Sequence, residues 1–330
     1  MALKVAINGT GRIGLCACRV IGNRDDIELV ALNTTAPIDT LVHLLKYDSV
    51  HRDYDAEKID EQTIRIGKHR HVKVYSDRDP LKVPFGESGA KVVIECTGAF
   101  NSLEKSSIHL HGGIEKVVIS APADNAPTFV YGVNHESYQG ESVVSNASCT
   151  TNCLAPIAKV LHEAFGIENG LMTTIHSYTN DQNILDVKHK DLRRARAAAM
   201  NMIPTSTGAA KAIGLVMPEL KGKMSGFSVR VPTPDVSLVD LSVNLSCAIT
   251  KESINAAMRE AALGAMKGLL LVDEEKRVSS DFIGSPYSAI FVPDCTTVVG
   301  EKSAKVLAWY DNEMGYSHRL VDMALWVGTH

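Results

Sequence analysis

The chain has 330 residues, a length that suggests two domains of ordinary size. Hydrophobic residues make up 45% of it and charged residues 22%, a balance that is typical of globular proteins and excludes a disordered or collagen-like chain. The net charge of −4 at pH 7 provides no basic excess, so we expect no nucleic-acid partner.

The first half of the chain alternates strand-like and helix-like segments. Continuous apolar runs predict strands at residues 5–8, 27–32, 91–96 and 116–120, and helices are predicted at 15–21 and 102–111. Buried strands that are linked by helices form parallel sheets covered on both faces. We therefore expect a doubly wound Rossmann domain of the α/β class.

The second half has a different pattern. Several of its strand-like segments alternate apolar and polar residues, which is typical of an antiparallel sheet with one packed face. The predicted strands are 171–176, 226–231, 237–245, 288–292 and 305–310, with a helix at 254–266. The charged stretch 181–196 has no clear periodicity and is predicted to be a long ordered loop. We expect an α+β domain with a mixed, largely antiparallel sheet that begins near residue 148.

A glycine loop joins the first predicted strand to the first predicted helix. Gly9, Gly11 and Gly14 fit the spacing G-x-G-x-x-G, which gains its value from this strand–loop–helix context. Gly9 permits a tight turn, Gly11 lets the backbone approach a pyrophosphate, and Gly14 allows the helix to pack closely. Because a helix N-terminus adds N–H donors and positive potential, the loop predicts a dinucleotide cofactor.

An acidic residue about 20 positions after such a loop usually holds the adenosine ribose. Here Thr34 occupies that place and follows Asn33, so the segment has no carboxylate. One interpretation is that the missing carboxylate removes a repulsion and admits the extra phosphate of NADP. The other is that the loop tolerates change, with Asn33 or Asp39 making the ribose contact. The residues alone leave both open.

Seven scattered cysteines form a poor disulfide framework and fit a reducing compartment, where one thiol can be reactive. Cys149 lies in a polar run directly before the helix-like segment 154–165. Since a helix N-terminus favours a thiolate, Cys149 is the predicted nucleophile. Cys153 lies one turn deeper and is predicted to be buried and inert.

The other five cysteines are expected to have structural roles. Cys96, Cys247 and Cys295 lie in apolar strand-like stretches, where we expect them to pack. Cys16 and Cys18 lie two positions apart on the helix after the glycine loop. Residues with that spacing do not share a helix face, so one of the two is expected to be exposed.

A thiolate nucleophile needs a positioned acid or base, and His176 is the candidate among 12 histidines. It ends a predicted strand, from which a side chain can project into a cleft. The pairs His69/His71 and His109/His111 have metal-like spacing, but neither has a third ligand nearby. We expect both pairs to be surface residues and predict no metal site.

The residues around Cys149 resemble the active-site signature of the phosphorylating glyceraldehyde-3-phosphate dehydrogenases. Four further blocks are similar to that family, in the expected order, so that the resemblance covers the whole chain. The five blocks are residues 148–152, 176–179, 207–211, 230–234 and 309–313. The resemblance implies a homotetramer, a dinucleotide-binding domain at 1–148 to which a final helix at about 314–330 returns, and a catalytic domain at 149–313.

The resemblance also implies the chemistry. Cys149 would attack the aldehyde of glyceraldehyde 3-phosphate, and His176 would move the protons. Inorganic phosphate would then release the acyl group as 1,3-bisphosphoglycerate. Thr179 and Arg230 resemble the pocket for the substrate's own phosphate. A second set of residues resembles the pocket for the attacking phosphate, Ser148, Thr150, Thr207, Gly208 and either Arg194 or Arg196. We expect one arginine of the run 193–196 to be only part of a solvated basic run or of an intersubunit salt bridge.

Cofactor contacts carry over in the same way. Arg12 and Ile13 match the pyrophosphate loop, whereas Arg78 and Ser120 match adenine-side and nicotinamide-side contacts. Asn312 matches the residue that fixes the nicotinamide carboxamide. Tyr316 is expected to pack beside the nicotinamide ring or in the core.

The sequence departs from the NAD-specific members of the family at two places. Those members usually have Asp at the position of Thr34 and Leu-Pro where this chain has Val187 and Lys188. In a tetramer this loop would reach a neighbour's adenosine, where Lys188 would offer positive charge to a 2′-phosphate. We therefore expect NAD, NADP or both as the cofactor.

Two other functions compete with this interpretation. Erythrose-4-phosphate dehydrogenase shares the cysteine–histidine chemistry, and semialdehyde dehydrogenases are more distant rivals. A purely binding role is disfavoured by the intact Cys149 and His176. The N-terminal apolar run is too short for a signal peptide, and no run approaches the ~20 apolar residues of a membrane span. We expect a cytoplasmic enzyme with no membrane partner.

Overall fold

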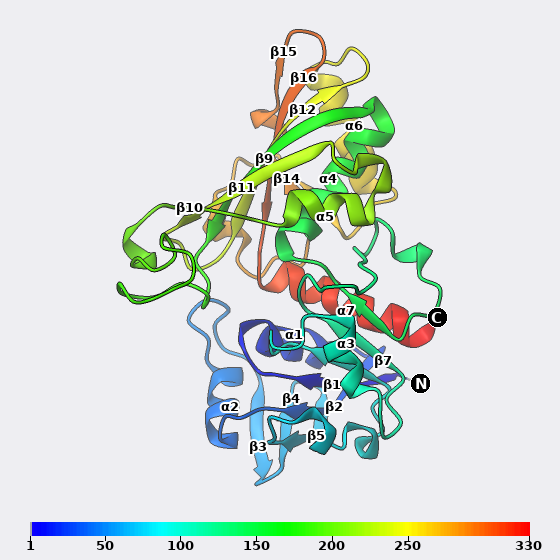
Figure 1. Cartoon of the computed structure of the whole chain (residues 1–330), viewed down its shortest axis with the longest axis vertical. Helices are drawn as coiled ribbons and strands as arrows, with labels where there is room; N and C mark the ends of the chain where they lie inside the picture. The colour runs from blue at the N-terminus through cyan, green and yellow to red at the C-terminus, as the bar shows by residue number, and fades with distance from the viewer. Residues whose placement is uncertain (1) are drawn as a thin grey trace. The chain divides into compact units, whose positions relative to one another are not determined.

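The computed structural model describes residues 2–330, which form two compact units (Figure 1). The first unit runs to Ser148 and takes up the chain again at Ser317–His330, and the second unit is Cys149–Tyr316. None of the helices in residues 2–330 combines the length and apolar character that a bilayer crossing requires.

The first unit is built on an eight-stranded sheet in the order β3-β4-β5-β2-β1-β6-β7-β8. Its strands are β1 (Leu3–Asn8), β2 (Ile27–Asn33), β3 (Ala56–Asp60), β4 (Thr63–Ile66), β5 (His69–Tyr75), β6 (Val92–Glu95), β7 (Lys116–Ile119) and β8 (Val143–Ser145). From β5 to β8 neighbouring strands are parallel, and β3 and β4 continue the sheet antiparallel. The helices of this unit are α1 (Arg12–Gly22), α2 (Ile38–Lys46), α3 (Leu103–Ser106) and most of α7 (Met314–Thr329).

The centre of this sheet follows directly from its composition. β1, β2 and β6 are apolar, and Val5, Ile7 and Val93 are fully buried, as expected for strands covered on both faces. The chain runs outward from β1 to β2 on one side and continues with β6 on the other. In doubly wound sheets, ligands bind at the carboxyl ends of the strands where the order reverses in this way.

The second unit holds the other large sheet, in the order β10-β11-β9-β12-β16-β14-β13, with β15 paired to β16. Its strands are β9 (Ile167–Ser177), β10 (Ile203–Thr205), β11 (Met224–Val231), β12 (Ser237–Leu245), β13 (Leu270–Val272), β14 (Ala289–Phe291), β15 (Thr297–Val299) and β16 (Ser303–Tyr310). β9 pairs with β11 in parallel and with β12 antiparallel, so the sheet is mixed. α4 (Cys149–Phe165), α5 (Ala209–Val216) and α6 (Lys251–Leu263) pack against it.

The predicted fold class is confirmed, with an α/β unit followed by a mixed, largely antiparallel one. The helix predicted at 102–111 is shorter, because α3 ends at Ser106 and gives way to a 3₁₀ turn at Ser107–His109. The strands β3 and β4 were not predicted, since their charged residues hide the apolar alternation. The stretch 181–196 contains no helix or strand, as predicted.

Predictions about several single residues are wrong. Cys16 and Cys18 are both buried, because α1 is covered on nearly all sides. Cys247 and Cys295 are exposed, since Cys247 lies in a bend after β12 and Cys295 ends a short 3₁₀ helix at Pro293–Cys295. His109 is buried rather than on the surface, and its ring hydrogen-bonds with a buried glutamate.

Candidate active site and cofactor pocket

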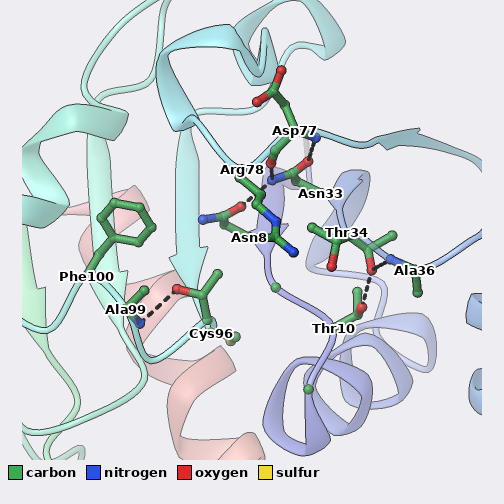
Figure 2. Close-up of a pocket in the computed structure, with 14 residues that line it drawn as sticks. Asn8, Thr10, Asn33, Thr34, Ala36, Asp77, Arg78, Cys96, Ala99 and Phe100 are labelled. Carbon is green, nitrogen blue, oxygen red and sulfur yellow. Dashed lines mark hydrogen bonds between the residues drawn. The ribbon is translucent and has the colours of Figure 1, made fainter.

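A cavity of about 510 Å³ opens in the first unit at the carboxyl ends of β1, β2 and β6 (Figure 2). Sequence analysis had singled out five of its lining residues, Gly9, Gly11, Asn33, Thr34 and Arg78. It did not assign a cofactor contact to the others, Asn8, Thr10, Thr35, Ala36, Asp77, Cys96, Thr97, Ala99 and Phe100. Asn8, Thr10, Thr35, Ala36 and Asp77 lie within two positions of residues already singled out. The other four, Cys96, Thr97, Ala99 and Phe100, follow β6 and have no motif of their own.

The glycine loop fits a pyrophosphate. Gly9 has a φ of 97°, and a Cβ there would lie 2.8 Å from atoms of Thr97. A Cβ on Gly14 would lie 2.1 Å from the carbonyl oxygen of Gly9, so only glycine allows this approach of α1 to the loop. At Gly11 a Cβ would meet nothing within 4 Å, which leaves bare backbone facing open space at the start of α1. Such a cradle suits a diphosphate.

At the position after β2 where an acidic residue usually holds the adenosine ribose, the pocket has hydroxyl groups instead of a carboxylate. The hydroxyls of Thr10 and Thr34 are 2.6 Å apart, and Thr34 also accepts a hydrogen bond from the N–H of Ala36 at 3.1 Å. Figure 2 shows the Asp77 carboxylate pointing away from Thr34, while the Arg78 side chain extends into the pocket. Asp39 does not line the pocket and pairs with Lys58 instead, at 3.2 Å.

The remaining predicted cofactor residues lie in three places. Arg12 and Ile13 begin α1. Because the Arg12 side chain pairs with Asp48, we expect Arg12 to contact a pyrophosphate through its backbone N–H. Ser120 directly follows β7 and hydrogen-bonds with the thiol of Cys96, a lining residue of the pocket. The other three belong to the second unit, where Lys188 is exposed and Asn312 and Tyr316 are buried.

Cys149 and His176 lie side by side in the second unit. Cys149 begins α4, as predicted, and its Sγ is 3.5 Å from Nε2 of His176 near the end of β9. His176 is only 4% exposed, while Cys149 is half-buried. Cys153 is fully buried one turn further along α4, as predicted. The geometry can support attack by the sulfur and proton transfer by the imidazole.

Two arginines impose charge on this pair. Arg230 lies opposite His176 in the register of β11 and β9, and its Nη1 is 2.7 Å from Nδ1 of His176. Burial, together with repulsion from Arg230 and Arg194, lowers the pKa of His176 to about 3. Two cations beside one buried neutral ring form a place where a bound anion is strongly favoured.

The thiol of Cys149 is also controlled by its surroundings. Burial raises its pKa, although Arg230 and hydrogen bonds at the start of α4 act in the opposite direction. The expectation that the helix N-terminus favours the thiolate therefore has the correct direction but is outweighed by burial. Formation of the thiolate depends on the charged neighbours as well as on the helix.

Tyr310 packs against the His176 side chain, and sequence analysis did not identify it as a site residue. Its hydroxyl is 2.9 Å from that of Thr150 and 2.8 Å from that of Thr174, and its ring meets His176 edge-on, with centroids 6.0 Å apart. Thr174 and His176 are two positions apart on β9, so their side chains face the same side of the sheet. That alternation was the signal available in the sequence.

The two candidate phosphate-binding arginines differ in their surroundings. Nε of Arg194 donates to the hydroxyl of Thr205 at 3.0 Å and its Nη2 donates to the carbonyl of Ser206 at 3.2 Å; Arg194 also pairs with Asp181. The guanidinium thus lies beside the segment that leads into Thr207 and Gly208 at the start of α5. Arg196 is well exposed and donates to Asp186 at 2.8 Å.

The other predicted anion contacts are placed as follows. Thr179 lies two residues after β9 and is half-buried, and its carbonyl accepts the N–H of Gln182 at 2.9 Å. Ser148 is the last residue of the first stretch of the first unit and is half-buried. The structure thus brings Arg230 and Arg194 to the Cys149–His176 pair and leaves Arg196 in a surface ion pair.

Comparison with known proteins gives the same picture along the whole chain. A model described as the glyceraldehyde 3-phosphate dehydrogenase NAD binding domain matches residues 3–103, and one described as the C-terminal domain of that enzyme matches residues 148–312. Glyceraldehyde-3-phosphate dehydrogenase of Geobacillus stearothermophilus is 53% identical over 100% of this chain and 99% of its own length. The chain belongs to the glyceraldehyde-3-phosphate dehydrogenase family. Glyceraldehyde-3-phosphate dehydrogenase 1 of Bacillus cereus is also 53% identical, over 98% of both chains.

As a member of this dehydrogenase family, the protein is an NAD(P)-dependent oxidoreductase. The first unit carries the match to the NAD binding domain and holds the pocket of Figure 2. The match to the C-terminal domain includes Cys149, His176 and Arg230. The family match and the local geometry therefore agree on which unit supplies which part of the chemistry.

The dehydrogenase has a buried carboxyl pair beside Asn312. Asn312 accepts a hydrogen bond from the hydroxyl of Ser237 at 2.6 Å, and Asp235 and Asp311 flank these two residues in the sequence. Asp311 accepts three backbone N–H groups, including that of Met314 at 2.7 Å. Burial and the charges of Asp311 and Glu313 hold the pKa of Asp235 well above its usual range. The carboxyl pair therefore holds a proton more readily than a free carboxyl group does.

This raised pKa predicts a stabilising substitution. An acid whose pKa rises on folding binds more protons when folded, so its contribution to stability falls as pH rises above about 4. Asp235→Asn keeps the shape of the protonated acid and removes the titration. We expect the variant to be more stable by about 1–3 kcal/mol at pH 8 and to gain little near pH 5. Thermal unfolding across this range measures the difference.

Asp240→Asn is the matched control for this prediction. Asp240 lies on β12 and pairs with Lys305 at 2.9 Å near the surface. An exposed pair of this kind contributes little, so its loss should not produce a stability gain that grows with pH. If Asp235→Asn and Asp240→Asn responded alike, the assignment of a proton to Asp235 would be wrong.

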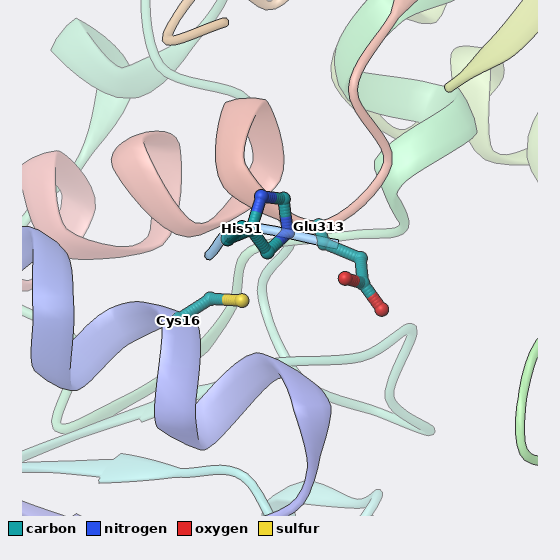
Figure 3. Close-up of side chains that lie close together, drawn as sticks. All are labelled: Cys16, His51 and Glu313. Carbon is teal, nitrogen blue, oxygen red and sulfur yellow. The ribbon is translucent and has the colours of Figure 1, made fainter. Parts of the chain in front are cut away.

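Cys16 and His51 form a second close pair, within the first unit (Figure 3). The ligand atoms of the two residues lie within 4.8 Å of one another. Glu313, which Figure 3 also draws, belongs to the second unit. Within residues 2–148 and 317–330, no third His, Cys, Asp or Glu joins the pair.

Proposed function

We propose that this chain is a phosphorylating glyceraldehyde-3-phosphate dehydrogenase that works in glycolysis and gluconeogenesis. It oxidises glyceraldehyde 3-phosphate, with NAD or NADP and inorganic phosphate, to 1,3-bisphosphoglycerate in a reversible reaction. The observation that carries the proposal is the Cys149–His176 pair, 3.5 Å apart, with the guanidinium of Arg230 beside the histidine. Full-length identity of 53% to a glyceraldehyde-3-phosphate dehydrogenase supports it.

Cys149 supplies the nucleophile. Its thiolate adds to the aldehyde carbon, and the oxygen takes up a proton, which gives a thiohemiacetal. His176 removes the hydroxyl proton as hydride leaves, and a thioester on Cys149 results. NAD or NADP, held in the pocket at Gly9, Gly11 and Arg78, would supply the acceptor for that hydride. An oxygen of inorganic phosphate then attacks the thioester carbonyl, the acyl phosphate departs, and the thiolate is restored.

Two anion sites flank the nucleophile in this proposal. Arg230 and Thr179 bind the phosphate of the substrate. Ser148, Thr150, Thr207, Gly208 and Arg194 bind the attacking phosphate, because hydroxyl, N–H and guanidinium groups suit phosphate oxygens. The position of Arg194 beside the Thr205–Ser206 backbone supports choosing it over Arg196, which we infer to have only the ion pair with Asp186.

The division of labour follows the two units. We infer that residues 1–148, with the helix at about 314–330, form the dinucleotide-binding domain, and that residues 149–313 form the catalytic domain. The pocket at Gly9, Gly11, Asn33, Thr34 and Arg78 supports the first inference. Asn312, held by Ser237, would hold the carboxamide of the nicotinamide.

A matrix of initial rates tests the function. Glyceraldehyde 3-phosphate and erythrose 4-phosphate are each assayed with NAD and with NADP, in the presence and absence of inorganic phosphate. We expect the highest kcat/KM with glyceraldehyde 3-phosphate and sustained turnover only with phosphate, because the thioester needs a phosphate acceptor. A preference for erythrose 4-phosphate, or full turnover without phosphate, would contradict the proposal.

The pocket also supports use of NADP. The segment that follows β2 has the hydroxyls of Thr34 and Thr35 but no carboxylate, and Arg78 extends into the pocket (Figure 2). A guanidinium without a facing carboxylate favours a 2′-phosphate. Lys188, exposed on its loop, would add positive charge from a neighbouring subunit. We infer that the enzyme accepts NADP, alone or alongside NAD.

Thr34→Asp tests this inference. The new carboxylate would repel the 2′-phosphate, so we expect kcat/KM with NADP to fall about 10- to 100-fold and kcat/KM with NAD to change little. Thr34→Ser keeps the hydroxyl that hydrogen-bonds with Thr10, so kcat/KM with NAD and with NADP should both stay unchanged. A several-hundredfold preference of the wild-type enzyme for NAD would refute NADP use.

Assembly and compartment complete the proposal. Within residues 181–202, five apolar side chains are each at least 71% exposed, Ile184, Leu185, Leu192, Met200 and Met202. A group of this kind marks a protein–protein surface, and we propose a homotetramer with no nucleic-acid or membrane partner. None of the seven cysteines forms a disulfide within residues 2–330, which supports a cytoplasmic location. Sedimentation should give about four times the chain mass, and a monomer would contradict the assembly.

A further inference from the structure

Glu95 is a buried carboxylate beneath the cofactor pocket that the proposed mechanism does not use. It ends β6, and its side chain is 0% exposed. It accepts hydrogen bonds from Nδ2 of Asn8 at 2.7 Å, from the backbone N–H of Thr97 at 2.6 Å and from the hydroxyl of Thr97, and lies 2.9 Å from Nε2 of His109. A buried carboxylate is tolerated only with such complete pairing.

The partners of Glu95 lead directly to the pocket wall. Asn8 accepts a hydrogen bond from Nδ2 of Asn33 at 2.7 Å. Asn33 in turn bonds with Asp77 twice, donating to its carbonyl at 2.8 Å and accepting its N–H at 3.0 Å. Asp77 immediately precedes Arg78. Figure 2 shows Asn8, Asn33 and Asp77 as a continuous hydrogen-bonded row that leads to the Arg78 side chain.

Thr97 connects the same carboxylate to the glycine loop. Its backbone N–H and its hydroxyl both donate to Glu95, and two of its atoms lie 2.8 Å from where a Cβ of Gly9 would be. Thr97 therefore sets one wall of the tight turn. Displacement of the Glu95 carboxylate would move both this wall and the Arg78 loop.

His109 orients the carboxylate. Its side chain is 0% exposed, and its ring stacks edge-on against Phe100, which lines the pocket, with centroids 5.6 Å apart. Its Nδ1 has no hydrogen-bond partner among residues 2–330. The single polar contact of this buried ring is therefore with Glu95, which is the contact that fixes the direction of the carboxylate.

We propose that Glu95 and His109 are positioning residues for the cofactor: His109 holds Glu95, and Glu95 sets the glycine turn through Thr97 and the Arg78 loop through Asn8 and Asn33. Neither residue lines the cofactor pocket. Their effect is on the affinity for the dinucleotide rather than on the chemistry at Cys149. The inference rests on the proposed cofactor site and adds two residues that support it.

His109→Leu and His109→Gln form the test pair. Leucine removes the contact with Glu95, whereas glutamine places a donor at about the position of Nε2. We expect His109→Leu to raise the Kd of the cofactor about tenfold, measured by fluorescence titration without substrate, and His109→Gln to restore it to within about threefold. KM for the cofactor should follow Kd, while kcat and KM for glyceraldehyde 3-phosphate stay within about twofold.

A double-mutant cycle identifies the route. Arg78→Ala should weaken cofactor binding by itself, and adding His109→Leu to it should cost clearly less than tenfold, because the loop that His109 positions has lost its side chain. Fully additive effects would show that the network does not act through Arg78 and would overturn that route.

The outcomes separate this inference from the cofactor site itself. If wild-type protein bound neither NAD nor NADP, the proposed cofactor site would fail. If wild type bound and His109→Leu lowered the melting temperature but left Kd unchanged, the network would be merely structural and this inference would be wrong. Should His109→Leu not fold, Glu95→Gln provides the same measurement. Glutamine keeps one acceptor oxygen and introduces an N–H group that opposes the Asn8 donor. An unchanged Kd of the cofactor in this variant would again overturn the proposal.

Discussion

Replacement of Cys149 by serine is expected to lower kcat for glyceraldehyde 3-phosphate by about 10³-fold or more. An alcohol at this position has a much higher pKa than a thiol, and burial, which already raises the pKa of Cys149, disfavours the charged form of either group. An ester would also accept phosphate less readily than a thioester does. Steady-state rates with saturating cofactor and phosphate measure the loss.

Cys153→Ser is the matched control for this variant. Cys153 is on the same helix, one turn deeper, and fully buried, with its Sγ 3.9 Å from the carbonyl oxygen of Ala308. We expect this change to reduce stability without abolishing turnover. If Cys149→Ser kept more than a tenth of wild-type kcat, a sulfur nucleophile at this position would be excluded.

Replacement of His176 by asparagine should lower kcat by about 10²- to 10⁴-fold. Asparagine keeps a polar group between Cys149 and Arg230 but cannot accept the hydroxyl proton at the reacting carbon. Without the histidine, activity depends on thiolate that forms unaided. Because burial raises the pKa of Cys149, the fraction of Cys149 that is thiolate is small at pH 7 and grows as pH rises. We expect the residual rate of His176→Asn to increase steadily up to pH 9.

The pH profile distinguishes loss of a base from loss of shape. A variant that is merely distorted would have a lower rate with the wild-type pH dependence. His71→Asn is the control, since His71 is an exposed histidine on β5. It should match wild type in both rate and profile. A flat profile for His176→Asn with nearly wild-type kcat would rule out proton transfer by this residue.

The parts of the site that the sequence predicted are local. The glycine loop, Cys149 at a helix start and His176 at a strand end are each defined within about ten residues, where backbone geometry follows from nearby side chains. The strand boundaries of β12 coincide with the predicted 237–245 for the same reason, since its alternation is regular.

The parts that were missed depend on tertiary contacts. Thr174 and Tyr310 meet because β9, β12 and β16 pair in one register, and Thr150 reaches Tyr310 from α4. No spacing in the sequence encodes the meeting of these three residues. His109 was predicted to lie on the surface because the His109/His111 pair has no third metal ligand nearby in the sequence. Its burial arises from the 3₁₀ turn that carries it against Glu95, a residue 14 positions away.

The discontinuity of the first unit has a consequence for synthesis of the protein. α7 contributes Leu320, Met323 and Val327 to the core of that unit, and a Cβ on Gly328 would lie within 3 Å of Leu3 and Val92. A ribosome that has released residues 1–148 has therefore supplied every strand of the sheet but not the helix that covers β1 and β6. Because domains generally fold as they emerge, we expect the first unit to keep apolar surface uncovered until α7 is made.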